Sequence, residues 1–370
     1  MESNSQWLAD RFQLRLTTEA TNWFDKEWQT ISGSGMSFNE AIDPKHVTES
    51  IWGGLMPPDT LPIAGNGCGD CLLARFGQDG ALNEIIAWYH EGGGWTHFGT
   101  TIQEAVNFDR AMYPFHLDDS LPPATLSTVI SRIAACEHTS KQALESPLLR
   151  ACRKHGGGRL AKSVGVDWPA FKTWLHDPSR IPAPILEKLA SRLNTTPHDL
   201  VHQDWNVAVA CAQAVMALRH DLAWPYAVTG WAYEREGKVV EAISVYAFGV
   251  FAPGSSASFT ELWTLGPKAA FKKFCVHRLL TLTPRDLPST VQEYLQEASR
   301  NREREYWIRR ATLATEAGNH QESYHHLYAA GWDAFSTNDG ALLEMMAEAA
   351  GRANAPTLQS LANAHLETLH

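Results

Sequence analysis

Residues 150–201 read RACRKHGGGRLAKSVGVDWPAFKTWLHDPSRIPAPILEKLASRLNTTPHDLV. Gly165 can adopt the positive φ of a tight turn, Asp167 is a suitable N-cap, and Pro169 is tolerated in a first helical turn. The apolar residues around this turn recur at the spacing of one helix face. They are Leu160, Val164, Val166, Phe171 and Trp174. The stretch therefore predicts short helices joined by a tight turn.

This stretch resembles the helix-turn-helix domains of the lambda-repressor and Cro type, within a module at 124–203. The resemblance assigns five helical pieces: one ending at 150–155, then 160–164, 168–176, 184–193, and a last one starting at 197–202. It places Ala161 where two helices nearly touch, and it implies that the third helix binds the DNA major groove. The DNA contacts that it implies are Arg150, Arg153, Lys154, Arg159, Lys162, Trp168, Lys172, Thr173, His176 and Arg180.

Two features favour another use of the module. Three glycines, 156–158, occupy the start of the second helix, where the family often has a polar side chain for the DNA backbone. Asp167, Trp168 and Pro169 replace the small polar residues that usually face the groove. A packing unit or a protein-binding surface is therefore an equal alternative to DNA binding.

Charge is distributed unevenly along the 370 residues. Residues 150–192 contain nine Lys/Arg against three Asp/Glu, a net charge of +6. Residues 1–120 contain six Lys/Arg against 17 Asp/Glu, a net charge of −11. This asymmetry is hard to explain by one uniform domain and indicates separate domains.

The acidic part contains two glycine-punctuated apolar runs. Residues 62–76 read PIAGNGCGDCLLARF, and residues 84–95 read EIIAWYHEGGGW. The runs at 71–76 and 85–89 predict strands that are joined by a turn at 78–80, whereas the spacing at 5–31 and 101–111 predicts helices. Gly67 and Gly69 supply positive φ before the first strand, and Asp70 can brace that turn.

These runs resemble the SUKH superfamily, the α+β fold of fungal cell-wall regulators and bacterial toxin-immunity proteins. The resemblance covers residues 50–110 and implies a protein-binding domain at 1–118, often for toxins. The acidic balance suits capture of a basic toxin, although it could also serve solubility alone. The candidate partner-binding residues are Trp52, Asp70, His90, Glu91 and Trp95.

Two possible chemical sites in the acidic part, a zinc site and an acid/base pair, have simpler structural explanations. Cys68 and Cys71 have CxxC spacing, but no second ligand pair accompanies them, which favours small cysteines beside a turn over a zinc site. His90 and Glu91 could form an acid/base pair, but a hairpin turn explains them more simply. We therefore expect no metal, no cofactor and no catalytic residue.

The C-terminal part, residues 204–370, is predicted to be an irregular tetratricopeptide-like array of helices. Small and aromatic residues with tetratricopeptide spacing carry this third resemblance. They are Gly230, Tyr233, Gly237, Ala242, Tyr246 and Pro253, with a weaker copy at Ala311, Ala314, Gly318, Ser323 and Leu327. The array implies peptide binding or self-association.

The sequence thus predicts a multidomain protein: an α+β domain, an all-α helix-turn-helix module and a helical array. The leading functional hypothesis is a non-enzymatic protein that binds and blocks a partner protein, possibly a toxin, as an immunity or adaptor protein. The alternative is a DNA-binding regulator with a helical sensor or dimerisation domain. The scattered cysteines and the absence of a long apolar run or leader predict a cytoplasmic location without membrane contact.

Overall fold

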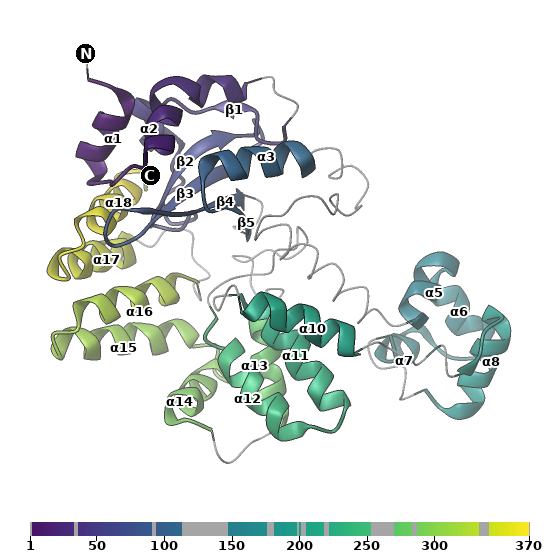
Figure 1. Ribbon diagram of the computed structural model, residues 1–370. Helices are drawn as coiled ribbons and strands as arrows, with labels where there is room; N and C mark the ends of the chain where they lie inside the picture. The colour runs from purple at the N-terminus through teal and green to yellow at the C-terminus, as the bar shows by residue number, and fades with distance from the viewer. Residues whose placement is uncertain are drawn as a thin grey trace.

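The described part of the chain begins with short helices and a five-stranded antiparallel sheet and continues with helices alone after β5 (Figure 1). This confirms the predicted order of a mixed α and β part before an all-helical part. The computed structural model describes residues 2–32, 36–90, 94–112, 147–175, 181–197, 200, 205–217, 222–252, 270–282, 287–332 and 340–369. The predicted domain boundary at 117–123 lies outside these residues.

The sheet is a meander in which every strand pairs with the next strand along the chain. Its strands are β1 (Glu40–Ala41), β2 (Thr60–Gly65), β3 (Cys71–Phe76), β4 (Leu82–Tyr89) and β5 (Gly94–Gly99). The predicted strands at 71–76 and 85–89 are confirmed. Gly80 has a φ of 79° in the turn between them, and Trp88 pairs with Trp95 across β4 and β5.

The helical character predicted for 5–31 is confirmed for most of the stretch, which is divided into several helices. This stretch forms α1 (Asn4–Phe12), α2 (Thr18–Asn22), the π-helical η1 (Trp23–Glu27) and the 3₁₀-helical η2 (Trp28–Ile31). Gln13 ends α1 in the left-handed conformation, with a φ of 56°. The next residues turn toward the sheet, where the Arg15 amide donates a 2.8 Å hydrogen bond to the Gly80 carbonyl. Tertiary pairing therefore interrupts the helical spacing.

Both faces of the sheet are buried, as the apolar sequence of β3 requires. Leu72 and Ala74 belong to one core, and their neighbours Cys71 and Leu73 belong to another. The first face packs against α1, α3 (Ile102–Met112) and α18 (Pro356–Glu367). The second face packs against α10 (Trp205–Met216) and α11 (Ala223–Arg235). The sheet is thus enclosed by helices from both ends of the chain.

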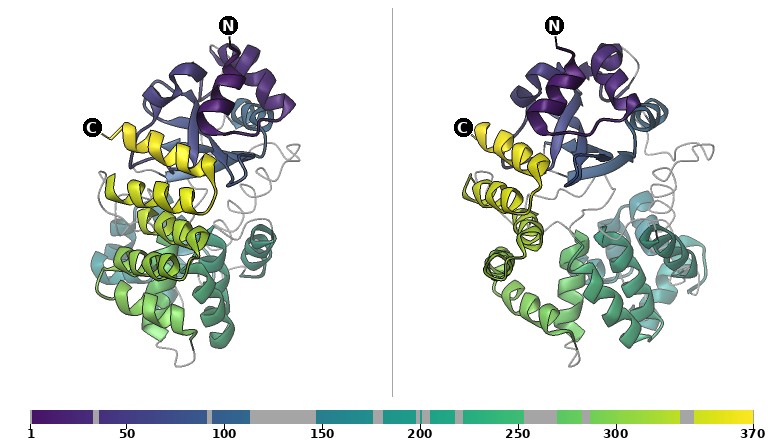
Figure 2. Two further views of the ribbon diagram at one scale, coloured as in Figure 1. Left: turned by 90° about the vertical axis from the view of Figure 1, so that its left-hand side faces the viewer. Right: turned by 60° about the vertical axis from the view of Figure 1, so that its left-hand side comes forward.

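The C-terminal helix α18 lies against the N-terminal sheet and α1 (Figure 2). Leu361 is fully buried in the first core, and the Thr357 hydroxyl donates a 2.7 Å hydrogen bond to the Gln13 carbonyl. A Cβ atom on Gly80 would lie 2.6 Å from that same carbonyl oxygen. The turn at Gly80 can therefore approach Gln13 this closely only because glycine has no side chain. The last helix is therefore a structural part of the sheet's core.

His365 on α18 makes this junction sensitive to pH. Its ring is fully buried, and its Nε2 donates to the Thr60 carbonyl at 3.1 Å. Burial lowers the pKa of His365 to about 4, although the Thr60 carbonyl and Asp59 oppose that shift. The unfolded chain binds this proton near pH 6.5. The stability linked to His365 is therefore complete above pH 6.5 and is lost as the pH falls toward 4.

We expect His365 to account for a loss of about 2 kcal/mol in unfolding free energy between pH 7 and pH 5. Urea unfolding of the wild type and of His365→Gln at both pH values measures it. Glutamine can still donate to the Thr60 carbonyl but does not titrate, so its profile should be flatter by that amount. Equal pH dependence of the two proteins would contradict the prediction.

The helical array continues with antiparallel neighbours. After α11 it contains α12 (Val239–Gly249), α13 (Ala270–Leu282), α14 (Ser289–Ala298), α15 (Glu303–Glu316), α16 (His320–Trp332) and α17 (Gly340–Arg352). Gly230 meets Tyr246 where α11 and α12 cross, and a Cβ atom there would lie 2.4 Å from the ring. Within the described residues, no helix combines the length and apolar character that a membrane span requires.

Among the residues that the structure describes between the sheet and the array, four helices form a basic module, at 147–200. They are α5 (Pro147–His155), α6 (Gly157–Ser163), α7 (Trp168–Thr173) and α8 (Ala183–Leu193). Gly165 has the predicted positive φ, 77°, and the Asp167 carboxylate caps α7 by accepting from the Ala170 amide at 2.8 Å. Leu160 and Phe171 are buried in a core that contains only residues of the module.

Candidate functional site

Trp52 is a large apolar side chain that the sheet holds near the surface. It follows η3 (Pro44–Ser50), a 3₁₀ helix that Asp43 caps. Its ring is 40% exposed, although it meets Trp88 edge to face at 5.8 Å and His90 at 5.7 Å between ring centroids. Because two rings fix it, Trp52 loses little conformational freedom on contact with a partner.

The turn before β3 positions Asp70 beside His90. Gly69 has a φ of 102°, and a Cβ atom there would lie 3.1 Å from the His90 ring. The Asp70 carboxylate accepts from the His90 amide at 2.9 Å, from the His90 Nδ1 at 2.8 Å and from the Asn66 side-chain amide at 2.8 Å. The predicted bracing role of Asp70 is confirmed, and it extends to the end of β4.

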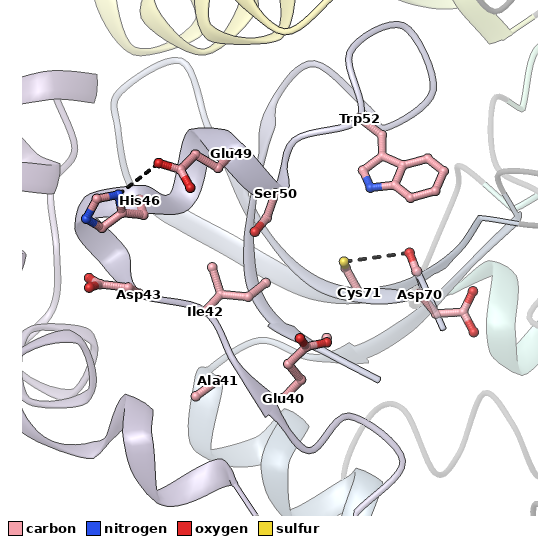
Figure 3. Close-up of a pocket in the computed structure, with 12 residues that line it drawn as sticks. Glu40, Ala41, Ile42, Asp43, His46, Glu49, Ser50, Trp52, Asp70 and Cys71 are labelled. Carbon is pink, nitrogen blue, oxygen red and sulfur yellow. Dashed lines mark hydrogen bonds and ion pairs between the residues drawn. The ribbon is translucent and has the colours of Figure 1, made fainter. Parts of the chain in front are cut away.

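A cavity of about 320 Å³ opens between these elements (Figure 3). Four carboxylates line it, and no lysine or arginine is found among its described lining residues. The lining carboxylates are Glu40, Asp43, Glu49 and Asp70. Trp52 and the start of β3 complete the wall, so the cavity joins a negative lining to an aromatic surface.

The cysteines at this site are in different environments. Cys71 lines the cavity and is buried, and burial raises the pKa of its thiol to about 12, whereas Cys68 is exposed. His46 contacts Glu49 at 2.9 Å, and that hydrogen bond raises the pKa of His46. In the parts of the chain that the structure describes, no three His, Cys, Asp or Glu side chains are placed to share one metal ion.

The structure brings together three of the five predicted partner-binding residues, Trp52, Asp70 and His90. Glu91 lies outside the described residues, and Trp95 is described only through its backbone pairing in β5. No protein-family model, curated protein or solved structure matches the chain. The case for a function therefore depends on the geometry of this site.

Glu40, Asp43 and Glu49 were not singled out in the sequence. The net charge of −11 over residues 1–120 indicated an acidic surface but not which carboxylates gather. They lie on β1, before η3 and within η3, and the cavity forms because β1 pairs with β2 beside the turn at Asp70. The capping position of Asp43 before Pro44 was the only local signal.

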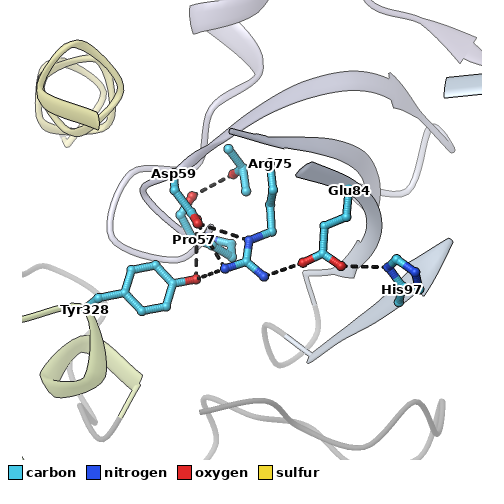
Figure 4. A network of polar contacts seen from close by, with 7 residues as sticks. Pro57, Asp59, Arg75, Glu84, His97 and Tyr328 are labelled. Carbon is cyan, nitrogen blue, oxygen red and sulfur yellow. Dashed lines mark hydrogen bonds and ion pairs between the residues drawn. The ribbon is translucent and has the colours of Figure 1, made fainter. Parts of the chain in front are cut away.

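A second polar cluster lies between the sheet and α16 (Figure 4). The Arg75 guanidinium donates to Asp59 at 3.0 and 3.1 Å, to Glu84 at 2.5 Å and to the Tyr328 hydroxyl at 3.1 Å. His97 contacts Glu84 at 2.6 Å. Burial opposes the charge of Arg75, but Asp59, Tyr328 and Glu84 raise the pKa of its guanidinium. The cluster joins β3 to the helical array, and we interpret it as structural.

The predicted DNA-contact residues of the basic module differ in exposure and in whether the structure describes them. The six lysines and arginines of its first three helices are exposed, namely Arg150, Arg153, Lys154, Arg159, Lys162 and Lys172. Thr173 is exposed, and its hydroxyl donates to the Ala170 carbonyl at 2.7 Å. His176 and Arg180 lie outside the described residues.

Trp168 makes an internal contact in this module. Its ring is 40% exposed and stacks on Phe171 at 6.1 Å between centroids. It also covers Gly157, because a Cβ atom there would lie 2.4 Å from the ring. The glycine at the start of α6 thus makes room for Trp168.

Proposed function

We propose that the chain is a non-enzymatic protein that binds and blocks a partner protein, as immunity and adaptor proteins do. The binding face is the surface around Trp52 and the acidic cavity. The observation that carries this proposal is the position of Trp52, which is 40% exposed, is held by Trp88 and His90, and lines a cavity that also contains four carboxylates. Tryptophan, tyrosine and arginine are enriched among the residues that contribute most to protein interfaces.

The charge of this face indicates the kind of partner. Residues 1–120 have a net charge of −11, and the cavity lining is acidic. Complementary charge accelerates encounter with a basic protein and discriminates against acidic ones. A basic toxin or a basic adaptor partner therefore suits the face best.

Trp52→Ala is expected to weaken partner binding roughly 30-fold, the loss typical of an interface anchor. The partner that co-purifies with the tagged wild type is identified by mass spectrometry, purified, and titrated against each variant. Trp168→Ala is the matched control, since Trp168 is equally exposed but lies in the basic module. Equal affinity of the wild type and Trp52→Ala would overturn the proposal. Co-expression tests blocking: the wild type should neutralise the partner, and Trp52→Ala should not.

A second candidate is DNA binding by the basic module. Residues 147–175 hold six exposed Lys/Arg and a single carboxylate, Asp167, which caps α7. Such a surface favours phosphate contacts, whereas the packing of Trp168 on Gly157 leaves it less available for reading bases.

Under this second candidate, Lys172→Ala combined with Arg153→Ala should weaken binding to a random-sequence duplex. Fluorescence anisotropy measures the affinity. The wild-type affinity should fall about 10³-fold or more between 50 and 200 mM salt if at least six phosphates are contacted. Undetectable binding at 50 mM salt would exclude DNA binding.

A further inference from the structure

Trp168 is a fixed and partly exposed aromatic ring on the basic module. It is 40% exposed on α7, and its ring stacks on Phe171 with an interplanar angle of 26°. It also lies against Gly157, which has no side chain that could displace it. Because two neighbours fix the ring, it can stack on a flat ligand with little loss of side-chain freedom.

Exposed cations lie near this ring. Lys172 follows Trp168 by four residues on α7, so the two side chains share one face of that helix. A Cβ atom on Gly156 would lie 3.1 Å from the Arg159 guanidinium. One on the next residue, Gly157, would lie 2.4 Å from the Trp168 ring. Since neighbouring Cα atoms are about 3.8 Å apart, the guanidinium and the ring lie within roughly 12 Å of each other. One extended polyanion can therefore contact the ring and both cations.

The exposed face of α7 is poorly equipped to read the edges of base pairs. Asp167 and Thr173 direct their side-chain oxygens to the backbone of α7 itself. Pro169 has no side-chain donor or acceptor, which leaves Lys172 and the Trp168 indole for contact with a ligand. Stacking on an aromatic ring needs no base edge and tolerates every base, but it requires bases that are outside a duplex. The surface therefore suits a single strand better than a duplex.

We infer that the basic module binds single-stranded nucleic acid, with a base stacked on Trp168 and phosphates paired with Arg159 and Lys172. Charge complementarity supports a polyanionic ligand, because residues 147–175 hold six exposed lysines and arginines and a single carboxylate. This activity goes beyond the proposed function, which uses the acidic face at Trp52. It also differs from duplex binding, because the contact with the base is stacking and not the reading of an edge in a groove.

The test uses the full chain and three labelled probes: an oligothymidylate of about 12 nucleotides, an abasic strand with the same number of phosphates, and a duplex of the same length. Fluorescence anisotropy at about 50 mM salt measures each affinity. The wild type should bind the oligothymidylate with a dissociation constant of roughly 1–100 µM. It should bind the abasic strand about tenfold more weakly, because that strand has no base to stack. An oligouridylate of the same length shows whether the site prefers RNA or DNA.

Trp168→Ala should weaken oligothymidylate binding about tenfold, to the level of the abasic strand, and should leave duplex binding within about twofold. Lys172→Ala should weaken both single strands alike and reduce the slope of log affinity against log salt by about 0.7, whereas Trp168→Ala should keep that slope. Trp52→Ala removes an equally exposed tryptophan outside the module and should bind as the wild type does. Trp168→Phe keeps a stacking ring and should stay within about threefold of the wild type. Thermal unfolding checks that each variant folds.

Equal wild-type affinity for the oligothymidylate and the abasic strand would overturn the inference. So would a loss in Trp168→Ala that is as large for the duplex as for the oligothymidylate, or no binding of the oligothymidylate by about 100 µM protein. The proposed function fails separately, because it is judged by the affinity of Trp52→Ala for the partner protein, and Trp52 lies outside the basic module.

Discussion

Replacing Arg75 with methionine is expected to lower the free energy of unfolding by about 3–5 kcal/mol. Arg75 lies between Asp59 and Glu84, and all three side chains are less than one-fifth exposed. Without the guanidinium, two carboxylates remain close together in the interior, and the Tyr328 hydroxyl loses a donor. Such a loss exceeds that of most single substitutions because the remaining charges cannot regain water.

Urea unfolding measures the effect, and hydrogen exchange at the β3 and β4 amides locates it. Arg11→Met is the control: Arg11 pairs with Glu367 at 3.0 Å, but both side chains are exposed, so its loss should stay below about 1 kcal/mol. Adding Asp59→Asn and Glu84→Gln to Arg75→Met should restore part of the stability, since it removes the uncompensated charges. A loss as small as that of Arg11→Met would contradict the structural role of the cluster.

Leu361→Ala in the last helix is expected to destabilise the N-terminal sheet by about 2–5 kcal/mol. Leu361 is fully buried in the core that contains Phe12, Leu72 and Phe98. The substitution leaves a cavity that the enclosed sheet cannot readily fill. The effect should therefore appear more than 200 residues away from the substituted position, in β2 and β3.

Hydrogen exchange distinguishes this outcome from a local one. The amides of β2 and β3 should lose protection together with those of α18. Leu313→Ala on α15 is the control, since its side chain is 51% exposed and its loss should stay within about 0.5 kcal/mol. Loss of protection confined to α17 and α18 would show that the sheet does not depend on the last helix.

Short-range features of the chain were predictable. The strand at 71–76, the positive φ of Gly67, Gly69 and Gly165, and the Asp167 cap all appear where the sequence indicated. Each depends on a residue and its neighbours within a few positions, where backbone sterics and capping decide the conformation. The break in the helical stretch at 5–31 shows the limit of such local prediction. The break depends on a contact with a distant residue, because the Arg15 amide pairs with the Gly80 carbonyl.

The candidate site was predictable only in part. Trp52, Asp70 and His90 could be chosen as exposed or turn residues of types that bind partners, and they lie together. Glu40 could not be placed in the same cavity, because the pairing of β1 with β2 brings it there. Charge counts give the sign of a surface but not the positions of its carboxylates.

By itself, the sequence determined the order of a sheet and then helices, the turns, the caps and the sign of charge in each part. Only the tertiary structure decided that α18 completes the core of the sheet, that Tyr328 joins Arg75 in a buried cluster, and that four carboxylates surround one cavity. The physical reason is that residue spacing shows which face of an element is apolar. It does not show which distant surface covers that face, since that choice depends on shape and charge complementarity between segments far apart in the chain.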